Sequence, residues 1–348
     1  MWFQRGKNLA DKAPLAQWKL NLLLIVVLLF CMLIALCVGK YRVSITDCLG
    51  IIFSDIFGTT SAFTSMDRNV ILGLRLPRVL AAVVVGSSLS ISGATYQGLF
   101  RNPLVSPDFL GVSSGACIGA ALAILLSLGS VYIQFFAFLG GIVAVAITTA
   151  IPKLLRSNSN IMLVLSGVIV SGLMSSIMGL LKYIADPTTK LAEITYWQMG
   201  SISYVLAPNL LSVIIPIVVS TVFLIMISWW INIISLGEKD AQTLGANTGR
   251  IRSVAILAAT LLTACSVSIS GTIGWIGLVV PHFGRMIAGP DNRRLIPACA
   301  LIGAIFLLFV DTLGRTVGRS ELPLSILTGI IGAPFYAFLL YRSRSRLS

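Results

Sequence analysis

Long apolar runs without charge alternate along this chain with short charged segments. The runs that contain no Asp, Glu, Lys or Arg are residues 20–39, 79–100, 109–152, 157–181, 194–237, 253–284, 295–310 and 322–341. Because one crossing of a bilayer takes about 20 apolar residues, the run at 109–152 is long enough for two. The pattern therefore predicts about ten transmembrane helices, near residues 20–39, 76–98, 109–127, 131–151, 161–181, 208–231, 254–270, 273–288, 295–313 and 323–341.

The run at 253–284 is too short for two full crossings. Its 32 residues give about 48 Å of helix, whereas two crossings of a hydrocarbon core about 30 Å thick need about 60 Å. A glycine-containing stretch, 271–277, lies in the middle of the run. We therefore expect a short or broken helix there, and irregular backbone at such depth must be buried in protein or line a cavity.

A short polar insert at 237–249 separates two of the charge-free runs and is too small to be a domain. Ala241, Leu244 and Gly245 fall on one face of a helix, at positions i, i+3 and i+4, while the charged residues 238–240 fall elsewhere. The spacing predicts a small amphipathic helix that a membrane protein would offer to a partner.

Composition indicates a membrane protein. Of 348 residues, 57 % are hydrophobic and only 11 % are charged, whereas a soluble domain carries about a quarter charged residues. We interpret the chain as an all-α polytopic membrane protein with one integral domain over 1–348: an N-terminal segment (1–19), a transmembrane bundle (20–341) and a basic tail (342–348). The first run lacks a convincing small-residue cleavage site, so we expect a retained span and not a signal peptide.

The basic residues predict the orientation of the bundle. With both termini in the cytoplasm, sixteen of the 25 Lys and Arg residues fall on the cytoplasmic side, as the positive-inside rule favours. This topology also places the insert at 237–249 in the cytoplasm. The net charge of +13 then reflects mainly the basic residues that set the orientation in the membrane. Nucleic acid is not an expected partner, because these charges are scattered over separate loops.

Small residues recur at four-residue spacing in two of the predicted spans. The stripes consist of Gly86, Ser90, Ala94 and Gly98, and of Gly111, Gly115 and Gly119. Small residues let helix backbones approach closely in lipid, so we expect simple bundle packing, with the lining of a translocation route as the alternative. The six cysteines are expected to be small buried hydrophobes. Cys48, outside the membrane, has no obvious partner.

The sequence contains no sign of its own energy source or of catalysis. No P-loop motif occurs. No predicted span carries a central Asp or Glu, which ion-coupled transporters usually place within the bilayer. His282 is the sole histidine and has no neighbouring Asp, Glu or Cys, so a metal site or catalytic triad is not expected. The charged residues nearest to the predicted spans lie at the ends of these spans: Arg75, Arg78, Arg101, Asp108, Arg285, Asp311 and Arg315.

Several arginines fall on the side opposite to the cytoplasm. Arg75 and Arg78 lie one helical turn apart beside Pro77 and could present two positive groups at the mouth of the bundle to an acidic partner, since guanidinium groups pair bidentately with carboxylates. The alternatives are interfacial anchoring by snorkelling and an Asp311–Arg315 helix pair.

A series of motifs in this chain resembles the permease family of bacterial importers for iron–siderophore complexes, haem and vitamin B12. The motifs run in family order over about 75–341 and are together highly specific. They are Leu74-Arg75-Leu76-Pro77-Arg78; Gly93-Ala94-x-x-Gln97-x-Leu99-x-Arg101-Asn102-Pro103-Leu104; Pro107-x-x-Leu110-Gly111-Val112-x-x-Gly115-Ala116; Gly237-Glu238-x-x-Ala241-x-x-Leu244-Gly245; Gly274-x-Ile276-Gly277-Leu278-Val279-x-Pro281-His282; and Glu321-Leu322-Pro323 with Gly329-x-x-Gly332-Ala333-Pro334.

The resemblance implies an ABC importer in the bacterial cytoplasmic membrane, with ten spans per permease subunit. Two permeases, expected to be identical copies, would surround a central route. Two separate ATPase subunits, which bind ATP and magnesium, would dock on the cytoplasmic side, and a substrate-binding protein would dock outside. No cofactor or metal is expected in this chain, and the subunit itself is not an enzyme.

The resemblance also implies roles for particular residues. ATPase coupling is implied for Gly237, Glu238, Ala241, Leu244 and Gly245. Binding-protein docking is implied for Arg75, Arg78 and Arg315, and a cytoplasmic gate for Asn102 and Leu104, with Asn160 as a looser match. His282 matches a family position without any implied catalytic role.

The expected cargo is a bulky metal chelate, for which family size favours an iron–siderophore over haem or vitamin B12. An ion-coupled secondary transporter is the alternative of a different class. It would need ionisable or helix-breaking ion sites at the midplane, for which the sequence offers only the break at 271–277. An intramembrane enzyme is a third class and lacks a catalytic pair.

Overall fold

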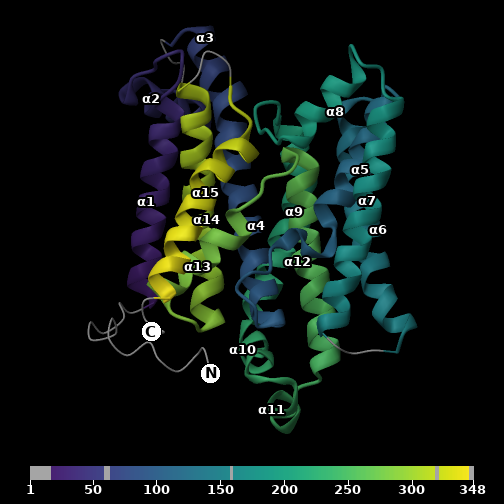
Figure 1. The fold of residues 1–348 in the computed structure, drawn as a ribbon. Coiled ribbons are helices and arrows are strands. Elements are labelled where there is room, and N and C mark those ends of the chain that lie inside the picture. The colour runs from purple at the N-terminus through teal and green to yellow at the C-terminus, as the bar shows by residue number, and fades with distance from the viewer. Residues whose placement is uncertain (1–16, 59–62, 157–159, 318–320, 345–348) are drawn as a thin grey trace.

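The computed structural model describes residues 17–58, 63–156, 160–317 and 321–344, and over these residues the chain is a bundle of helices without strands (Figure 1). Seven helices or helical segments are long and apolar enough to cross a membrane. They are α1 (Gln17–Cys37), α4 (Leu76–Phe100, continuous with α3 and η1), α6 (Ser130–Leu154), α7 (Asn160–Ile184), α9 (Ala207–Met226), α12 (Thr248–Ser270) and α14 (Asn292–Thr316).

Three further apolar helices are shorter: α5 (Val112–Leu125), α13 (Ile276–Ala288) and the part Leu324–Phe338 of α15 (Leu324–Arg344). Together with the seven long helices they coincide with the ten expected spans, whereas the count of membrane crossings stays a prediction. The expected span at 208–231 differs from the structure, because α9 ends at Met226 and a separate helix, α10 (Ser228–Leu236), follows it.

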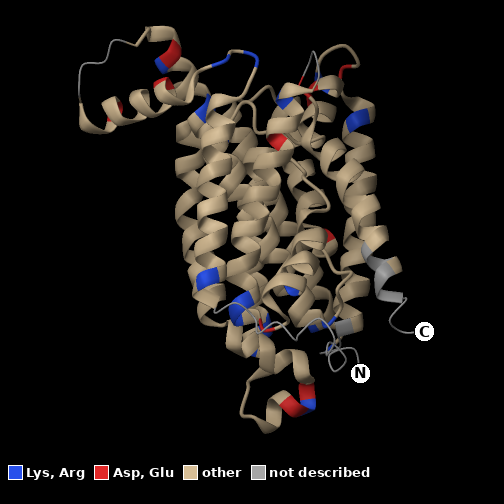
Figure 2. Ribbon diagram, turned by 90° about the vertical axis from the view of Figure 1, so that its left-hand side faces the viewer, with Lys and Arg blue, Asp and Glu red and all other residues tan. Residues whose placement is uncertain are grey.

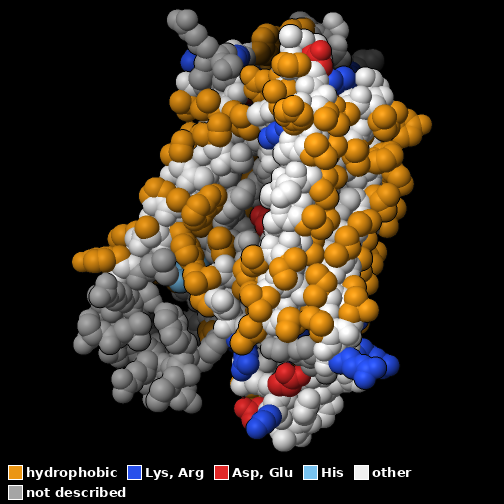
Figure 3. All heavy atoms as spheres, turned by 45° about the vertical axis from the view of Figure 1, so that its right-hand side comes forward, with side chains coloured by type: hydrophobic (Ala, Val, Ile, Leu, Met, Phe, Trp, Pro, Cys, Tyr) orange, Lys and Arg blue, Asp and Glu red, His pale blue; other side chains and the backbone are white. Residues whose placement is uncertain are grey.

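Small helices lie at both ends of the bundle. The end that carries α2 (Ile45–Phe57), α3 (Ser65–Arg68) and α8 (Lys190–Gln198) is called the outer end here, and the opposite end carries α11 (Glu238–Thr243) (Figure 1). The first helix begins and the last helix ends at the α11 end, which requires an even number of crossings. Charged residues gather at the two ends (Figure 2), and hydrophobic side chains cover the flank between them (Figure 3).

Helix α4 lies at the centre of the bundle, and 19 of its 25 residues are buried. Its small residues permit very close contacts: a Cβ at Gly86 would lie 2.3 Å from the carbonyl oxygen of Gly303, and one at Gly93 would lie 2.0 Å from that of Gly277. The stripe on α5 packs likewise against α6, since a Cβ at Gly115 would lie 2.3 Å from the carbonyl oxygen of Gly140. The packing role predicted for the small-residue stripes is confirmed.

The predicted break between residues 271 and 277 is present. Helix α12 ends at Ser270, non-helical residues follow, and α13 begins at Ile276. Trp275 has a left-handed φ of 69° and rests on Gly332 of α15. The loop after α8 supplies hydrogen-bond partners to backbone groups near the break: Ser201 N donates to the carbonyl of Ser270 at 2.7 Å. Such partners are needed wherever a helix is interrupted inside a membrane.

The thiol of Cys48 is buried in α2 beside the end of α1. Its pKa is raised to about 12 by burial and by the neighbouring thiol of Cys37. Cys37 and Cys48 are both free cysteines, and the packing of α2 against α1 brings their side chains close together.

Candidate functional site

An ionic cluster occupies the outer end of the bundle. Arg78, in the first turn of α4, holds the buried carboxylate of Asp311 through two nitrogens, with Nη2–Oδ1 at 2.9 Å and Nε–Oδ2 at 3.1 Å. Its third nitrogen, Nη1, donates to both oxygens of Glu321 at 3.0 Å. Arg315, one turn after Asp311, lies 3.8 Å from the same carboxylate. The cluster thus ties α4, α14 and the segment before α15 together.

The other predicted docking arginines are turned inward. Arg75 is buried and donates from Nη1 to the carbonyl of Leu36 at 2.6 Å and from Nη2 to that of Tyr41. Arg315, also buried, donates to the carbonyl of Ala35. The last carbonyls of α1 have no partner within their own helix, and positive charge at a helix C-terminus is favourable. Both arginines therefore stabilise the end of α1, a contact that the sequence did not predict.

Glu321 is the acidic member that sequence reasoning missed, although it lies in one of the quoted motifs. Burial alone would raise its pKa, but the hydrogen bond from Ser203 and the Arg78 guanidinium outweigh that effect, so the pKa of Glu321 is lowered from 4.5. A carboxyl group with a lowered pKa stabilises the folded state above its unfolded pKa and loses that contribution as pH falls through the folded value.

We therefore expect the thermal stability of the detergent-solubilised protein to exceed that of the Glu321→Gln variant near pH 7 and to lose this advantage below about pH 4.5. The difference is expected to be small, because Glu321 is 44 % exposed and exposed pairs are screened by solvent. Parallel melting curves at several pH values check this. A constant difference between the two proteins down to pH 3 would contradict it.

Helix α11 projects beyond the bundle at the end where α1 begins and α15 ends (Figures 1 and 2). It is anchored by Ala241, which is fully buried against Ile233 and Ala246, and by Glu238, whose carboxylate lies 3.9 Å from Arg252 of α12. Leu244, the residue after the helix, is 58 % exposed. The single apolar face expected from the spacing is therefore wrong: Ala241 faces the protein and Leu244 faces away, because the helix stops before Leu244.

Glycines define both ends of α11. Gly237 precedes the helix with a φ of 137°, and Gly245 follows Leu244 with a φ of 79°. Both values fall in the region that favours glycine. The two residues fix the entry and exit of the chain, so that α11 stands as a separate turn of helix between α10 and α12.

The predicted gate residues lie in part beside this helix. Asn102 and Leu104 are exposed in the loop after α4, and Asn102 Oδ1 accepts a hydrogen bond from the backbone of Leu104 at 2.9 Å. The neighbouring Arg101 reaches the base of α11, with its Nη1 3.5 Å from a Cβ built at Gly237. Asn160 begins α7, and its side chain lies outside the described residues.

Asp108 does not lie at a span end. It belongs to η2 (Pro107–Leu110), and Pro107 packs on Gly277 at a point where Leu89, halfway along α4, also approaches. Gly111 reaches Val170 in the middle of α7. The chain therefore returns to mid-depth before α5 begins. The expectation that no acidic residue lies centrally is corrected: the carboxylate of Asp108 is exposed there and accepts a hydrogen bond from Ser113.

His282 lies in α13 with its ring edge-on to Tyr336 of α15, at 6.0 Å between ring centroids. Its neighbour in the next helical turn, Arg285, donates from Nη1 to the side-chain oxygen of Gln97 at 2.6 Å. These contacts join α13 to α15 and α4.

Comparison with known proteins matches residues 27–342 to the model of the FecCD transport family. The chain is 37 % identical over 332 residues to the molybdate import system permease protein MolB of Haemophilus influenzae, covering 95 % of this chain and 97 % of that one. It is 40 % identical to a "probable iron chelatin transport system permease protein" of Helicobacter pylori, covering 79 % and 83 %. A solved structure described as an inward-facing conformation of a metal-chelate type ABC transporter superposes with a TM-score of 0.84 at 36 % identity, covering 93 % and 99 %.

Proposed function

Since this chain belongs to the FecCD transport family of ABC importer permeases, we propose that it carries a metal chelate of the iron–siderophore type across the bacterial cytoplasmic membrane, driven by two separate ATPase subunits that bind ATP and magnesium. The observation that carries the proposal is the match over residues 27–342 combined with α11, a small anchored helix at one end of the bundle that exposes Leu244.

The cargo is the least constrained part of the proposal. An iron chelate is supported by the Helicobacter pylori relative and by the metal-chelate transporter structure. Molybdate is the second candidate, because MolB is 37 % identical over almost the whole chain. Haem and vitamin B12 remain the alternatives that share the same architecture.

Uptake by proteoliposomes that contain the permease, its ATPase and its binding protein tests the proposal. We expect ATP-dependent uptake of a radiolabelled ferric siderophore, with no uptake on an ion gradient alone. Parallel assays with molybdate, haem and vitamin B12 identify the cargo if it differs. Transport that runs on an ion gradient without ATP would contradict the importer mechanism itself.

We propose that α7 contacts the second permease copy. Its outward face carries small residues at helical spacing, and a Cβ built at Gly172 or Gly179 would meet nothing within 4 Å. Ser175 and Ser176, also exposed, lie between them. Small residues at an exposed intramembrane face allow close approach of another helix, which supports a homodimer packed through this face.

We propose that the binding protein docks at the outer end. Arg78 is the arginine best placed to release Glu321 and bind a carboxylate of the binding protein instead. Arg75 and Arg315 hold the end of α1, so reversing their charge would disturb the fold as well as docking. Arg78 contacts Glu321, which lies in the non-helical segment before α15 and is 44 % exposed. A carboxylate of the binding protein that replaced Glu321 would accept from the same nitrogen, Nη1, while Asp311 kept its two bonds to Arg78.

The gate proposed at Asn102, Leu104 and Asn160 is supported by the place of the loop after α4, next to the base of α11. Movement of α11 by the ATPase would reach this loop through Arg101. The transport cycle then consists of two packings of the same helices, which is the usual form of such switching.

A further inference from the structure

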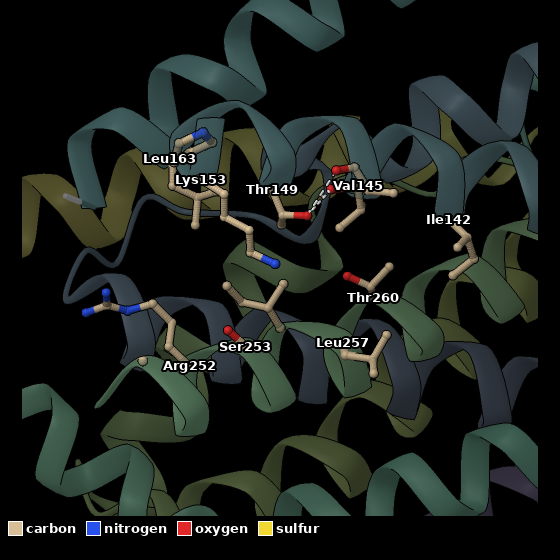
Figure 4. A pocket seen from close by; sticks show the side chains of 13 residues that line it. Ile142, Val145, Thr149, Lys153, Leu163, Arg252, Ser253, Leu257 and Thr260 are labelled. Atoms are coloured by element: carbon tan, nitrogen blue, oxygen red, sulfur yellow. Dashed lines mark hydrogen bonds between the residues drawn. The ribbon is translucent and has the colours of Figure 1, made fainter. Parts of the chain in front are cut away.

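A pocket of about 340 Å³ opens between α6, α7 and α12 near the α11 end of the bundle (Figure 4). Its walls are apolar along most of their length and include Ile142 and Leu163 on one side and Leu257 on the other. Leu257 is 56 % exposed, so the pocket is a groove on the side of the bundle. None of the residues to which a role was assigned above lies in it, except Arg252.

Two basic residues line one end of this pocket, Lys153 from the last turn of α6 and Arg252 from the first turns of α12. The guanidinium group of Arg252 points away from the pocket (Figure 4), on the side of its weak ion pair with Glu238. The ammonium group of Lys153 points into the space between the two helices (Figure 4). Lys153 has no ion pair with any residue in the described ranges. The hydroxyl groups of Thr149 and Ser253 line the same part of the pocket.

The change from polar to apolar runs along the helices. From Lys153 to Ile142 is about 16 Å along α6, and from Arg252 to Thr260 is about 12 Å along α12. Half of a hydrocarbon core is about 15 Å thick. The groove has basic residues at its mouth, where the helices end, and apolar walls over the depth of one leaflet. These features match a molecule with an anionic head group and hydrocarbon chains.

We propose that this pocket binds an anionic phospholipid, with the head-group phosphate at Lys153, beside the positive charge of Arg252, and an acyl chain between Ile142 and Leu257. Basic pockets between transmembrane helices at a membrane surface bind such head groups, and the charge of the rim selects an anionic lipid over a zwitterionic one. The hydroxyl group of Ser253 supplies a hydrogen-bond donor for the phosphate oxygens, whereas that of Thr149 donates to the carbonyl of Val145 at 2.8 Å. The inference requires that the chain spans a bilayer, and it is independent of the cargo.

The site has a direct connection to α11. Arg252, at the mouth of the pocket, also lies 3.9 Å from Glu238 in the first turn of that helix. A phosphate beside Arg252 competes with this weak ion pair. Lys153 is therefore the better residue to change in a test, because its substitution leaves the Glu238 contact intact.

Native mass spectrometry of the purified full-length chain, titrated with phosphatidylglycerol or phosphatidylcholine, tests the proposal. We expect a preference for phosphatidylglycerol that falls about fivefold in Lys153→Gln, the effect of one basic residue near an anionic surface. The matched control is Arg250→Gln, which removes the same charge two residues from Arg252 but outside the pocket. Ala146→Trp, which fills the groove without changing charge, is expected to remove one bound lipid.

A second measurement locates the lipid. Ser253→Cys places a thiol in the pocket, and its rate of maleimide labelling is compared with the background of the six native cysteines. Phosphatidylglycerol is expected to slow labelling at least several-fold, while phosphatidylcholine and inorganic phosphate leave it unchanged. Equal protection by inorganic phosphate would show an anion site without a lipid, and protection by the transported chelate alone would assign the pocket to the cargo route. Either result, or unchanged lipid preference in both Lys153→Gln and Ala146→Trp, overturns the proposal.

Discussion

Replacing Leu244 by aspartate is expected to detach the ATPase subunits and abolish ATP-driven uptake. Leu244 is the large apolar side chain that α11 leaves exposed, and a partner surface that buries it would have to bury an unpaired carboxylate in the variant. Such burial costs several kcal/mol, and a loss of about 3 kcal/mol weakens association by about two orders of magnitude. The fold should persist, because Ala241 and not Leu244 anchors the helix.

Co-purification of the ATPase with tagged permease measures this effect, together with uptake in proteoliposomes. Leu244→Met keeps the apolar volume and is the matched control, which should retain the complex. The melting temperature of the isolated permease should be the same for all three proteins. A stable complex with Leu244→Asp would remove Leu244 from the contact surface and leave the coupling role of α11 unsupported.

Replacing Asp311 by alanine is expected to cause the largest loss of stability in the chain's outer end. Asp311 is fully buried, and Arg78 and Arg315 both lie within 4 Å of its carboxylate. Removing one partner of a buried ion pair leaves an uncompensated charge, at a cost of about 3–5 kcal/mol. The end of α1 should loosen too, since Arg315 also holds its last turn.

Thermal unfolding of the solubilised protein, followed by size-exclusion chromatography, measures the loss. Glu321→Gln provides the comparison within the same cluster, because it contacts the same arginine but is half exposed, and we expect it to cost under about 1 kcal/mol. If Asp311→Ala melts no earlier than Glu321→Gln, the buried pair does not stabilise the fold as described.

Much of the architecture could be predicted from the sequence because lipid imposes simple rules on it. Charge-free runs marked the apolar helices, and the length of the run at 253–284 predicted the break before α13. Small residues predicted that α4 packs closely in the bundle, and the structure showed that its partners are α13 and α14. The polar insert predicted α11, although only the structure showed that Ala241 and Leu244 face opposite ways, since the exact end of a short helix depends on its glycines and neighbours.

The charged residues were harder to assign. The spacing of Arg75 and Arg78 indicated exposed positive groups, and the family resemblance implied the same role for Arg315. In the structure Arg75 and Arg315 close the end of α1, and Arg78 binds two carboxylates. Their partners are carbonyls and acids far away along the chain, up to 280 residues apart for Arg315 and Ala35. Asp108 was misplaced for a related reason, because a loop that folds back into the bundle has the same composition as one that stays outside.

The sequence by itself determined that this protein is a helical membrane permease of a particular family. It also determined that a polar segment at 237–249 stands apart from the bundle. Both follow from the length of apolar runs and from local motif spacing, which are properties of contiguous residues. Only the tertiary structure decided which charges are buried, that Leu244 after α11 faces outward, and that Lys153 and Arg252 line the same groove between α6 and α12. Those outcomes depend on helices separated by about a hundred residues and on the desolvation of charge, which no local pattern encodes.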